Sequence, residues 1–171
     1  MKKIVIMGHI DHGKTTLLRA VEAVANDGDT RLINEGDAVT ASIDGEDYVF
    51  VDCKDDDEYR GKLTGKEAGA IIVVSATEGP MMGTKEAVDL CNELGIPVTA
   101  IFMTMADLVA DDELLELIEM DTLGLMDDCG LNGDDIPVIK GSGKMAIGYR
   151  DMEKHAGPVK ELLKTIADAL K

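Results

Sequence analysis

Eight residues near the start of the chain have the types and spacing that bind phosphate. Residues 8–15 (GHIDHGKT) fit the pattern G-x-x-x-x-G-K-[ST], in which two glycines let the backbone N–H groups point at phosphate oxygens. We expect Lys14 to reach the β- and γ-phosphates, and the Thr15 hydroxyl to hold Mg²⁺. The predicted phosphate-binding residues are His9, Ile10, Asp11, His12, Gly13, Lys14, Thr15 and Thr16.

The flanking residues predict the elements that hold this loop. Residues 3–7 form a short apolar run, typical of a buried parallel strand. Leu17, Leu18, Val21 and Val24 then recur at helical spacing, which predicts a helix over 14–26. A chance glycine pair between a strand and a helix is the alternative. A strand, a loop and a helix N-terminus in this order favour anion binding instead.

The rest of the chain alternates β-rich runs with helical patterns. We predict a hairpin at Asp44-Gly45-Glu46, a loop over 30–36 and a loop over 76–83. Such alternation indicates an α/β fold, in which a mostly parallel sheet has helices on both faces and ligands bind at the carboxyl ends of the strands. The further predicted strands are 38–43, 48–52, 69–75, 97–103 and 136–139. The further predicted helices are a short one ending at Lys66, one over 84–94, one over 111–128, and one from Gly157-Pro158 to Leu170.

Composition limits the possible class of protein. The 171 residues predict one domain, and 45% hydrophobic residues indicate a globular chain. The net charge of −17 argues against direct nucleic-acid binding, which needs clustered Lys and Arg. Solubility explains the acidity better than a basic partner does. No apolar run is long enough for a membrane span, and three widely spaced cysteines indicate a reducing compartment, so we expect a cytoplasmic monomer.

Five stretches resemble the nucleotide-binding domain of elongation factor Tu, a translational GTPase. The resemblance runs nearly from end to end, without the two β-barrel domains of that family. The stretches are residues 8–17 (GHIDHGKTTL), 51–53 (VDC), 76–81 (ATEGPM), 111–120 (DDELLELIEM) and 133–138 (GDDIPV). The resemblance implies a P-loop NTPase fold with a six-stranded sheet and one antiparallel hairpin strand. It also implies GTP or GDP as ligand with Mg²⁺, and GTP hydrolysis coupled to loop switching.

The base-reading motifs depart from the family pattern. The family's Asn-Lys-x-Asp is Thr104-Met105-Ala106-Asp107 here, so the carboxylate that reads guanine is kept but the bracing Asn and the stacking Lys are lost. The family's Ser-Ala-Leu is Ser142-Gly143-Lys144, in which the Lys144 stem could cover the base. By resemblance, the base-binding residues are Thr104, Met105, Asp107, Ser142, Gly143 and Lys144.

The switch motifs depart further. The family's Asp-Cys-Pro-Gly-His is residues 52–56 (DCKDD) here, so Asp52 keeps its place as a metal-site acid. Asp55 replaces the γ-phosphate-sensing glycine, and Asp56 replaces the water-positioning histidine of the catalytic site. Asn34 takes the place of the Mg²⁺-binding threonine. These changes predict weak or absent GTP hydrolysis, with Lys14 and an inactive Asp56 in the catalytic positions and with Thr15 and Asp52 at the metal.

Several of these residues also have structural interpretations. We expect His9 and His12 to be surface residues whose backbone, rather than imidazole, contributes to binding. Asp11 could face a monovalent cation or be a solvated loop acid, and residues 55–58 form a solvated acidic turn rather than a second metal site. Met81 and Met82 are predicted to fill gaps in the core. The same core is predicted to include Leu114, Leu115, Leu117 and Ile118.

Three functions remain open. The leading hypothesis is a guanine-nucleotide-binding domain with reduced turnover. The second is a non-catalytic P-loop scaffold, minimised or redesigned, which the lost motifs and the short loops favour. The third is an ATP-using P-loop protein, which the loss of the Asn-Lys pair would permit.

Overall fold

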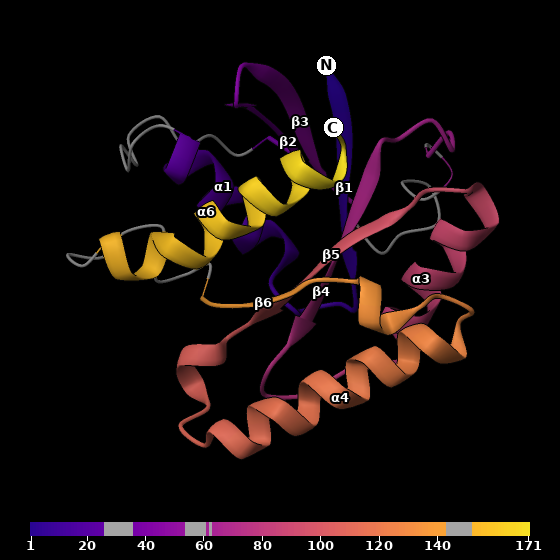
Figure 1. Ribbon diagram of the computed structural model, residues 1–171, viewed down its shortest axis with the longest axis vertical. Helices are drawn as coiled ribbons and strands as arrows, with labels where there is room; N and C mark the ends of the chain where they lie inside the picture. Colours follow the sequence, from indigo (N-terminus) through magenta and orange to yellow (C-terminus); the bar gives the residue numbers. More distant parts are fainter. Residues whose placement is uncertain (26–35, 54–60, 62, 143–151) are drawn as a thin grey trace.

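The computed structural model describes residues 1–25, 36–53, 61, 63–142 and 152–171. Its strands form one six-stranded sheet in the order β2-β3-β1-β4-β5-β6 (Figure 1). Every neighbouring pair is parallel except β2 and β3, which form the predicted hairpin. The strands are β1 (Lys2–Gly8), β2 (Ala38–Ile43), β3 (Glu46–Asp52), β4 (Gly69–Ser75), β5 (Val98–Thr104) and β6 (Val138–Lys140). The predicted α/β class and strand pairing are confirmed.

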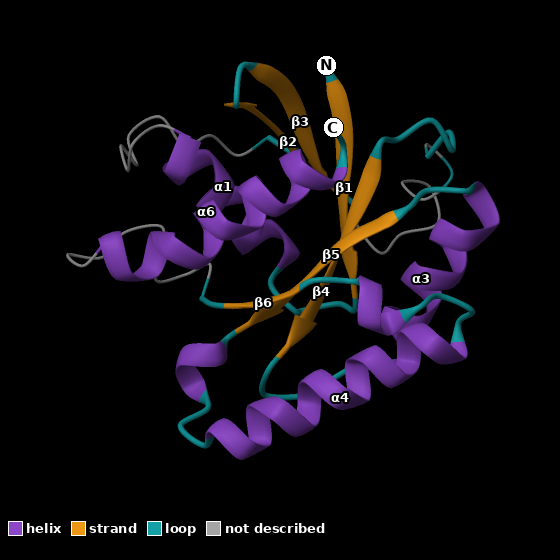
Figure 2. Cartoon of the chain, viewed as in Figure 1, coloured by secondary structure: helices purple, strands orange, loops and turns teal. Residues whose placement is uncertain are grey.

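The helices cover both faces of this sheet (Figure 2). Helices α1 (Lys14–Ala25) and α6 (Met152–Ala169) pack on one face, and α3 (Met82–Leu94) and α4 (Asp112–Asp128) on the other. Two 3₁₀ turns, η2 (Ala106–Leu108) and η3 (Gly133–Asp135), flank α4. No helix in the described ranges combines the length and the apolar character that a bilayer crossing requires.

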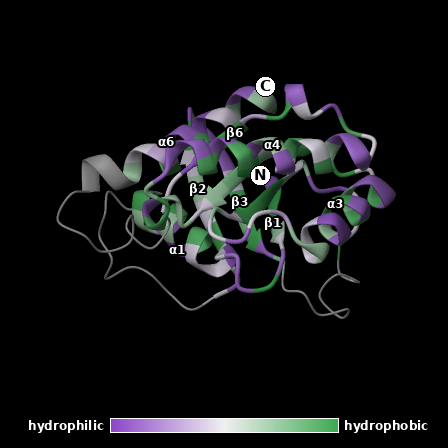
Figure 3. Ribbon diagram, turned by 90° about the horizontal axis from the view of Figure 1, so that it is seen from below, coloured by the Kyte–Doolittle hydropathy of each residue, from purple (hydrophilic) through white to green (hydrophobic). Residues whose placement is uncertain are grey.

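The core consists of two apolar layers separated by the sheet. Strand β4 is buried along its whole length, because it lies in the middle of the sheet with helices on both sides. Its alternate residues face the two layers: Ile71 and Val73 lie with α1 and α6, and Ile72 and Val74 with α3 and α4. Figure 3 shows strands between the helices coloured mainly as hydrophobic. A rigid sheet therefore fixes the strand ends from which the site is built.

Helix boundaries show where local signals decide the fold. Helix α3 ends at Leu94, followed by Gly95 with a left-handed φ of 73°, as predicted. Helix α4 begins after Asp111, whose side chain accepts a hydrogen bond from the backbone N–H of Glu113.

The start of the last helix was predicted wrongly. Helix α6 begins at Met152, so Pro158 lies inside the helix rather than at its start. A proline in the helix interior removes a backbone hydrogen bond. Pro158 also packs close to Gly141, where an added Cβ would lie only 2.7 Å from the Pro158 Cβ. Tertiary packing of the proline ring explains its position.

Three further predictions about helices and core were also wrong. The short helix ending at Lys66 is not helical at residues 61 and 63–66, while its remaining residues lie outside the described part of the chain. Met81 and Met82 are 41% and 75% exposed rather than core residues. Leu114 and Leu117 are also exposed, whereas Ile118 is buried and Leu115 packs against the core as predicted. Helix α4 fully buries only Ile118, Thr122 and Met126, so Leu114, Leu117 and Met120 remain exposed.

Candidate functional site

The phosphate loop connects β1 to α1 at the carboxyl edge of the sheet. Gly8 lies against β4, and an added Cβ would be 2.3 Å from the Val73 carbonyl oxygen, so only glycine fits there. Asp11 and Gly13 adopt left-handed φ values of 61° and 92°. Such values suit glycine and are tolerated by aspartate more readily than by most residues. The Leu17 N–H then donates to the Gly13 carbonyl at 2.9 Å and starts α1.

Lys14 lies within the curve of this loop. Its Nζ donates to the carbonyl oxygens of Gly8 at 3.2 Å and His9 at 3.1 Å, and the residue is 8% exposed. A buried cation surrounded by loop carbonyls lies where a phosphate anion would bind. Lys14 thus lies inside the loop, and its contact with phosphate stays a prediction.

Thr15 and Asp52 meet beside the loop. The Thr15 hydroxyl donates to Asp52 Oδ2 at 2.5 Å, from the first turn of α1 to the last residue of β3. Asp52 is 2% exposed, and its Oδ1 atom has no hydrogen-bond partner among the described residues. A buried carboxylate oxygen without a partner is unfavourable unless a cation or water completes its environment. Hydroxyl and carboxylate oxygens are ligands that Mg²⁺ accepts, so these two residues fit the metal.

The imidazoles of His9 and His12 both make hydrogen bonds within the chain, and the burial of His12 corrects the prediction that it is a surface residue. His12 is fully buried, and its Nδ1 accepts the backbone N–H of Ser75 at 3.2 Å. The Nε2 atom therefore carries the proton and donates to Glu78 Oε2 at 2.8 Å. His9 is partly exposed, and its Nδ1 accepts the N–H of Gly83 at 3.0 Å. The two imidazoles thus tie the loop to the end of β4 and to the first turn of α3.

Burial dominates the titration of His12. Removal of the ring from water lowers its pKa below the ordinary 6.5, and the hydrogen bond to Glu78 offsets this only in part. The positive charge of nearby Lys14 also lowers this pKa. The neutral ring is therefore the form that holds the loop, since a proton on Nδ1 would remove the acceptor that Ser75 uses.

Thr104 replaces the family asparagine and still braces the loop. Its hydroxyl donates to the His12 carbonyl at 2.6 Å from the last residue of β5, and Thr104 is 4% exposed. The expectation that the loss of Asn removes this brace is therefore wrong. The available signal was a polar residue at the end of a buried strand, because a hydroxyl there can donate one hydrogen bond to a neighbouring carbonyl.

The base-reading segment follows Thr104. Met105 has a left-handed φ of 58°, and its sulfur accepts a weak hydrogen bond from the Ser75 hydroxyl at 3.5 Å. Asp107 is exposed in η2. The Ala106 N–H donates to the Gly141 carbonyl at 3.2 Å, which brings this turn beside the buried Ser142. Asp107 and Ser142 thus follow the neighbouring strands β5 and β6, and their contact with a base stays a prediction.

Some predicted site residues lie outside the described residues. They are Asn34, Asp55, Asp56, Gly143 and Lys144, together with the loop over 30–35 and the acidic turn over 55–58. Ile10 and Asp11 are exposed at the loop tip, and Thr16 is partly exposed in α1. In the described part of the chain, no group of three or more His, Cys, Asp or Glu side chains could hold a metal. Thr15 and Asp52 alone could hold a metal only if further ligands, such as phosphate oxygens and water, completed its coordination.

One family model matches this chain. It is described as the elongation factor Tu GTP binding domain, and it covers residues 48–171, well over half of the sequence. The matched range contains Asp52, Thr104, Asp107 and Ser142, while the phosphate loop precedes it and is identified by its motif and its geometry. The strand order, the phosphate loop at the end of β1 and this match lead to one conclusion. The chain belongs to the family of the elongation factor Tu GTP binding domain.

Proposed function

We propose that this domain binds guanine nucleotides with Mg²⁺ through residues 9–16, holds GDP in preference to GTP, and hydrolyses GTP weakly or not at all. The observation that carries the proposal is the Thr15–Asp52 contact with its unpartnered, buried Asp52 Oδ1. A divalent cation at this point would be bound by Thr15 and supported by Asp52. It would neutralise charge on the phosphates next to Lys14.

The test of binding is a titration with labelled GDP and ADP, with and without Mg²⁺. Saturable, Mg²⁺-dependent GDP binding is expected in the parent. Lys14→Ala should abolish it, because the buried cation is lost, whereas Lys164→Ala on the exposed face of α6 should leave it unchanged. Thermal unfolding of both variants checks that they fold. A parent without saturable binding would replace this proposal by the non-catalytic scaffold.

Base preference rests on Asp107. A carboxylate accepts both the N1–H and the exocyclic amine of guanine, whereas adenine does not offer it this pair of donors. Asp107 is exposed and can be hydrated when adenine is bound, so the difference in affinity is expected to be modest. We expect GDP to bind more tightly than ADP, by less than in a family member with the full Asn-Lys-x-Asp motif. Asp107→Asn should reduce the difference. Equal affinities for GDP and ADP in the parent would favour the ATP-using alternative or a site without base recognition.

Weak hydrolysis is proposed from the sequence at residues 55 and 56. Phosphoryl transfer needs a positioned water and compensation of the charge on the γ-phosphate. Asp55 and Asp56 add negative charge at the two family positions that serve these purposes, which opposes that compensation and favours GDP over GTP. Single-turnover hydrolysis should be slow in the parent and faster in Asp55→Gly/Asp56→His. A parent as fast as an intact family member would contradict this assignment.

A further inference from the structure

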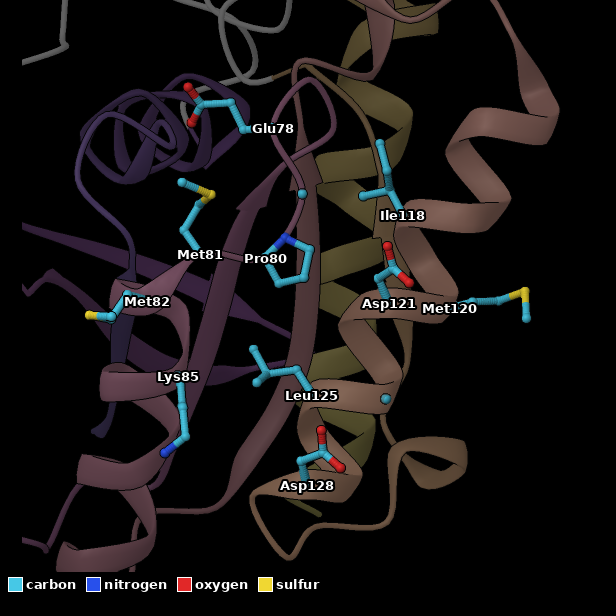
Figure 4. Close-up of a pocket in the computed structure, with 12 residues that line it drawn as sticks. Glu78, Pro80, Met81, Met82, Lys85, Ile118, Met120, Asp121, Leu125 and Asp128 are labelled. Atoms are coloured by element: carbon cyan, nitrogen blue, oxygen red, sulfur yellow. The ribbon is translucent and has the colours of Figure 1, made fainter.

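A chain of hydrogen bonds joins the end of strand β4 to the base-reading turn and ends on a sulfur atom. Ser75 is the last residue of β4, Thr77 lies in the loop that follows it, and Met105 comes directly after β5. Figure 4 shows the later part of that loop, from Glu78 to Pro80, as it leads toward α3. We call Ser75, Thr77 and Met105 the thioether clasp, because their side chains contact one another through polar atoms.

Each hydroxyl of the thioether clasp has one proton to donate, and the distances indicate where each proton goes. Ser75 Oγ and Thr77 Oγ1 lie 2.8 Å apart. The Met105 sulfur lies 3.5 Å from Ser75 Oγ and 4.0 Å from Thr77 Oγ1. The shorter distance assigns the Ser75 proton to the sulfur, so the Thr77 hydroxyl donates to Ser75 Oγ. Ser75 Oγ also accepts the Thr77 N–H at 3.2 Å, so both of its lone pairs are used.

The backbone of Met105 determines the direction of the turn that carries Asp107. Met105 has a left-handed φ of 58°, which is unfavourable for a residue with a long side chain unless its surroundings hold it. It is also the N-cap of η2, where its carbonyl accepts the Leu108 N–H at 3.0 Å. Asp107 is the middle residue of η2. A contact that holds the Met105 side chain therefore also holds the turn from which the Asp107 carboxylate projects.

Ser75 contacts the phosphate loop and the base-reading turn through different atoms. Its backbone N–H donates to His12 Nδ1 at 3.2 Å, whereas its hydroxyl donates to the Met105 sulfur. Ser75 is 1% exposed and Met105 is partly exposed, so the clasp extends from the core to the edge of the site. Removal of the hydroxyl alone should therefore disturb the turn and leave the bond to the phosphate loop in place.

We propose that Ser75 and Thr77 are positioning residues for base recognition, which act on Asp107 through the sulfur of Met105. This inference rests on the proposed binding of guanine nucleotides and extends it to two residues outside the phosphate, metal and base sets. A thioether can accept a hydrogen bond, whereas a lysine ammonium or a hydrocarbon side chain cannot. The clasp therefore supports the turn in a chain that lacks the Asn-Lys pair, and it depends on methionine at position 105.

The test compares two ligands that share phosphate groups but differ in the base. GDP and inorganic pyrophosphate are titrated into the full chain with Mg²⁺ by calorimetry. Ser75→Ala is expected to weaken GDP binding by about three- to tenfold and to change pyrophosphate binding by less than about twofold. Thr77→Val should weaken GDP binding by about two- to threefold, because Thr77 acts through Ser75. Thr77→Ser keeps the hydroxyl and should bind GDP as the parent does.

A double-mutant cycle tests whether the Ser75 hydroxyl acts through the sulfur. Met105→Leu removes the acceptor and keeps an apolar side chain of similar size. It should weaken GDP binding about as much as Ser75→Ala does, and Ser75→Ala/Met105→Leu should weaken it little further. The matched control is Thr122→Val, which removes a fully buried hydroxyl that donates to the Ile118 carbonyl at 2.7 Å within α4. It should leave both affinities unchanged, and thermal unfolding monitors the fold of each variant.

The outcomes separate this inference from the proposed function. If the parent binds GDP and Ser75→Ala binds it equally well, the clasp has no part in base recognition, and nucleotide binding stands. Equal weakening of GDP and pyrophosphate in Ser75→Ala would show a general structural role instead. Additive losses in Ser75→Ala/Met105→Leu would show that Ser75 acts by a route other than the sulfur. A parent that binds neither ligand would contradict the proposed function itself, and this inference with it.

Discussion

The brace from Thr104 to the phosphate loop can be removed by one isosteric change. Thr104→Val replaces the hydroxyl by a methyl group and leaves the buried His12 carbonyl without its 2.6 Å partner. An unpaired buried carbonyl is unfavourable by about 1–3 kcal/mol. For a domain of this size each kcal/mol lowers Tm by about 2–4 °C, so a fall of roughly 2–12 °C is expected. The lost hydrogen bond belongs to the phosphate loop itself, so the loop should be held less firmly in its binding shape. GDP affinity should therefore decrease by about tenfold, which corresponds to 1.4 kcal/mol.

The same strand supplies the control. Thr99 lies near the other end of β5, is 7% exposed, and donates its hydroxyl to the Ala70 carbonyl at 3.0 Å. Thr99→Val should therefore lower Tm by a comparable amount and change GDP affinity by less than about twofold. Thermal unfolding and GDP titration of the two variants measure both quantities. Equal losses of affinity, or no loss in Thr104→Val, would refute the assignment of Thr104 as the brace.

Three further perturbations test other parts of the site. Burial lowers the pKa of His12, so the unfolded chain binds more protons than the folded one as pH falls below about 6.5. The contribution of neutral His12 to the free energy of unfolding should be fully present above that pH, and the urea midpoint of the parent should fall below it. The urea midpoint of His12→Asn should lack this part of the pH dependence. Asp52→Asn should weaken the Mg²⁺ dependence of GDP binding, measured by titration with and without the metal, while GDP binding without Mg²⁺ should change little. Gly8→Ala should unfold at a markedly lower temperature, or fail to fold, because its Cβ would lie 2.3 Å from the Val73 oxygen; an unchanged Tm would show that β1 and β4 can separate there.

The positions of the strands and the contact between Thr15 and Asp52 can be predicted directly from the sequence. The apolar run from Gly69 to Ser75 predicts β4 without error, because a strand buried on both faces has few alternatives. Thr15 and Asp52 are predicted to meet, since the end of β3 and the start of α1 adjoin the same edge of a parallel sheet. Motif and topology suffice for such contacts, which depend on backbone placement.

Contacts that depend on side-chain packing were not predicted. The hydrogen bond from Thr104 to the phosphate loop can be recognised only once β5 is seen to lie beside the loop. In the sequence, a threonine in place of the family asparagine indicates only that the amide is lost. His12 has no sequence signal for burial in a glycine-containing loop. Helix α4 carries apolar residues around too wide an arc for one buried face, and the sequence does not say which of them, such as Leu117, remains uncovered.

The anchoring of the phosphate loop has a consequence for how ligand binding proceeds. Thr104, the Ser75 N–H and the Gly83 N–H all hold the loop through contacts within the chain itself. Because these contacts form without a ligand, we expect the loop to have this shape in most molecules, so that apparent and intrinsic affinity nearly coincide. The free-energy cost of ordering the loop is then part of the free energy of folding and does not weaken nucleotide binding. We therefore expect nucleotide to enter in a single kinetic phase, at a rate that reflects collision and orientation rather than a preceding rearrangement.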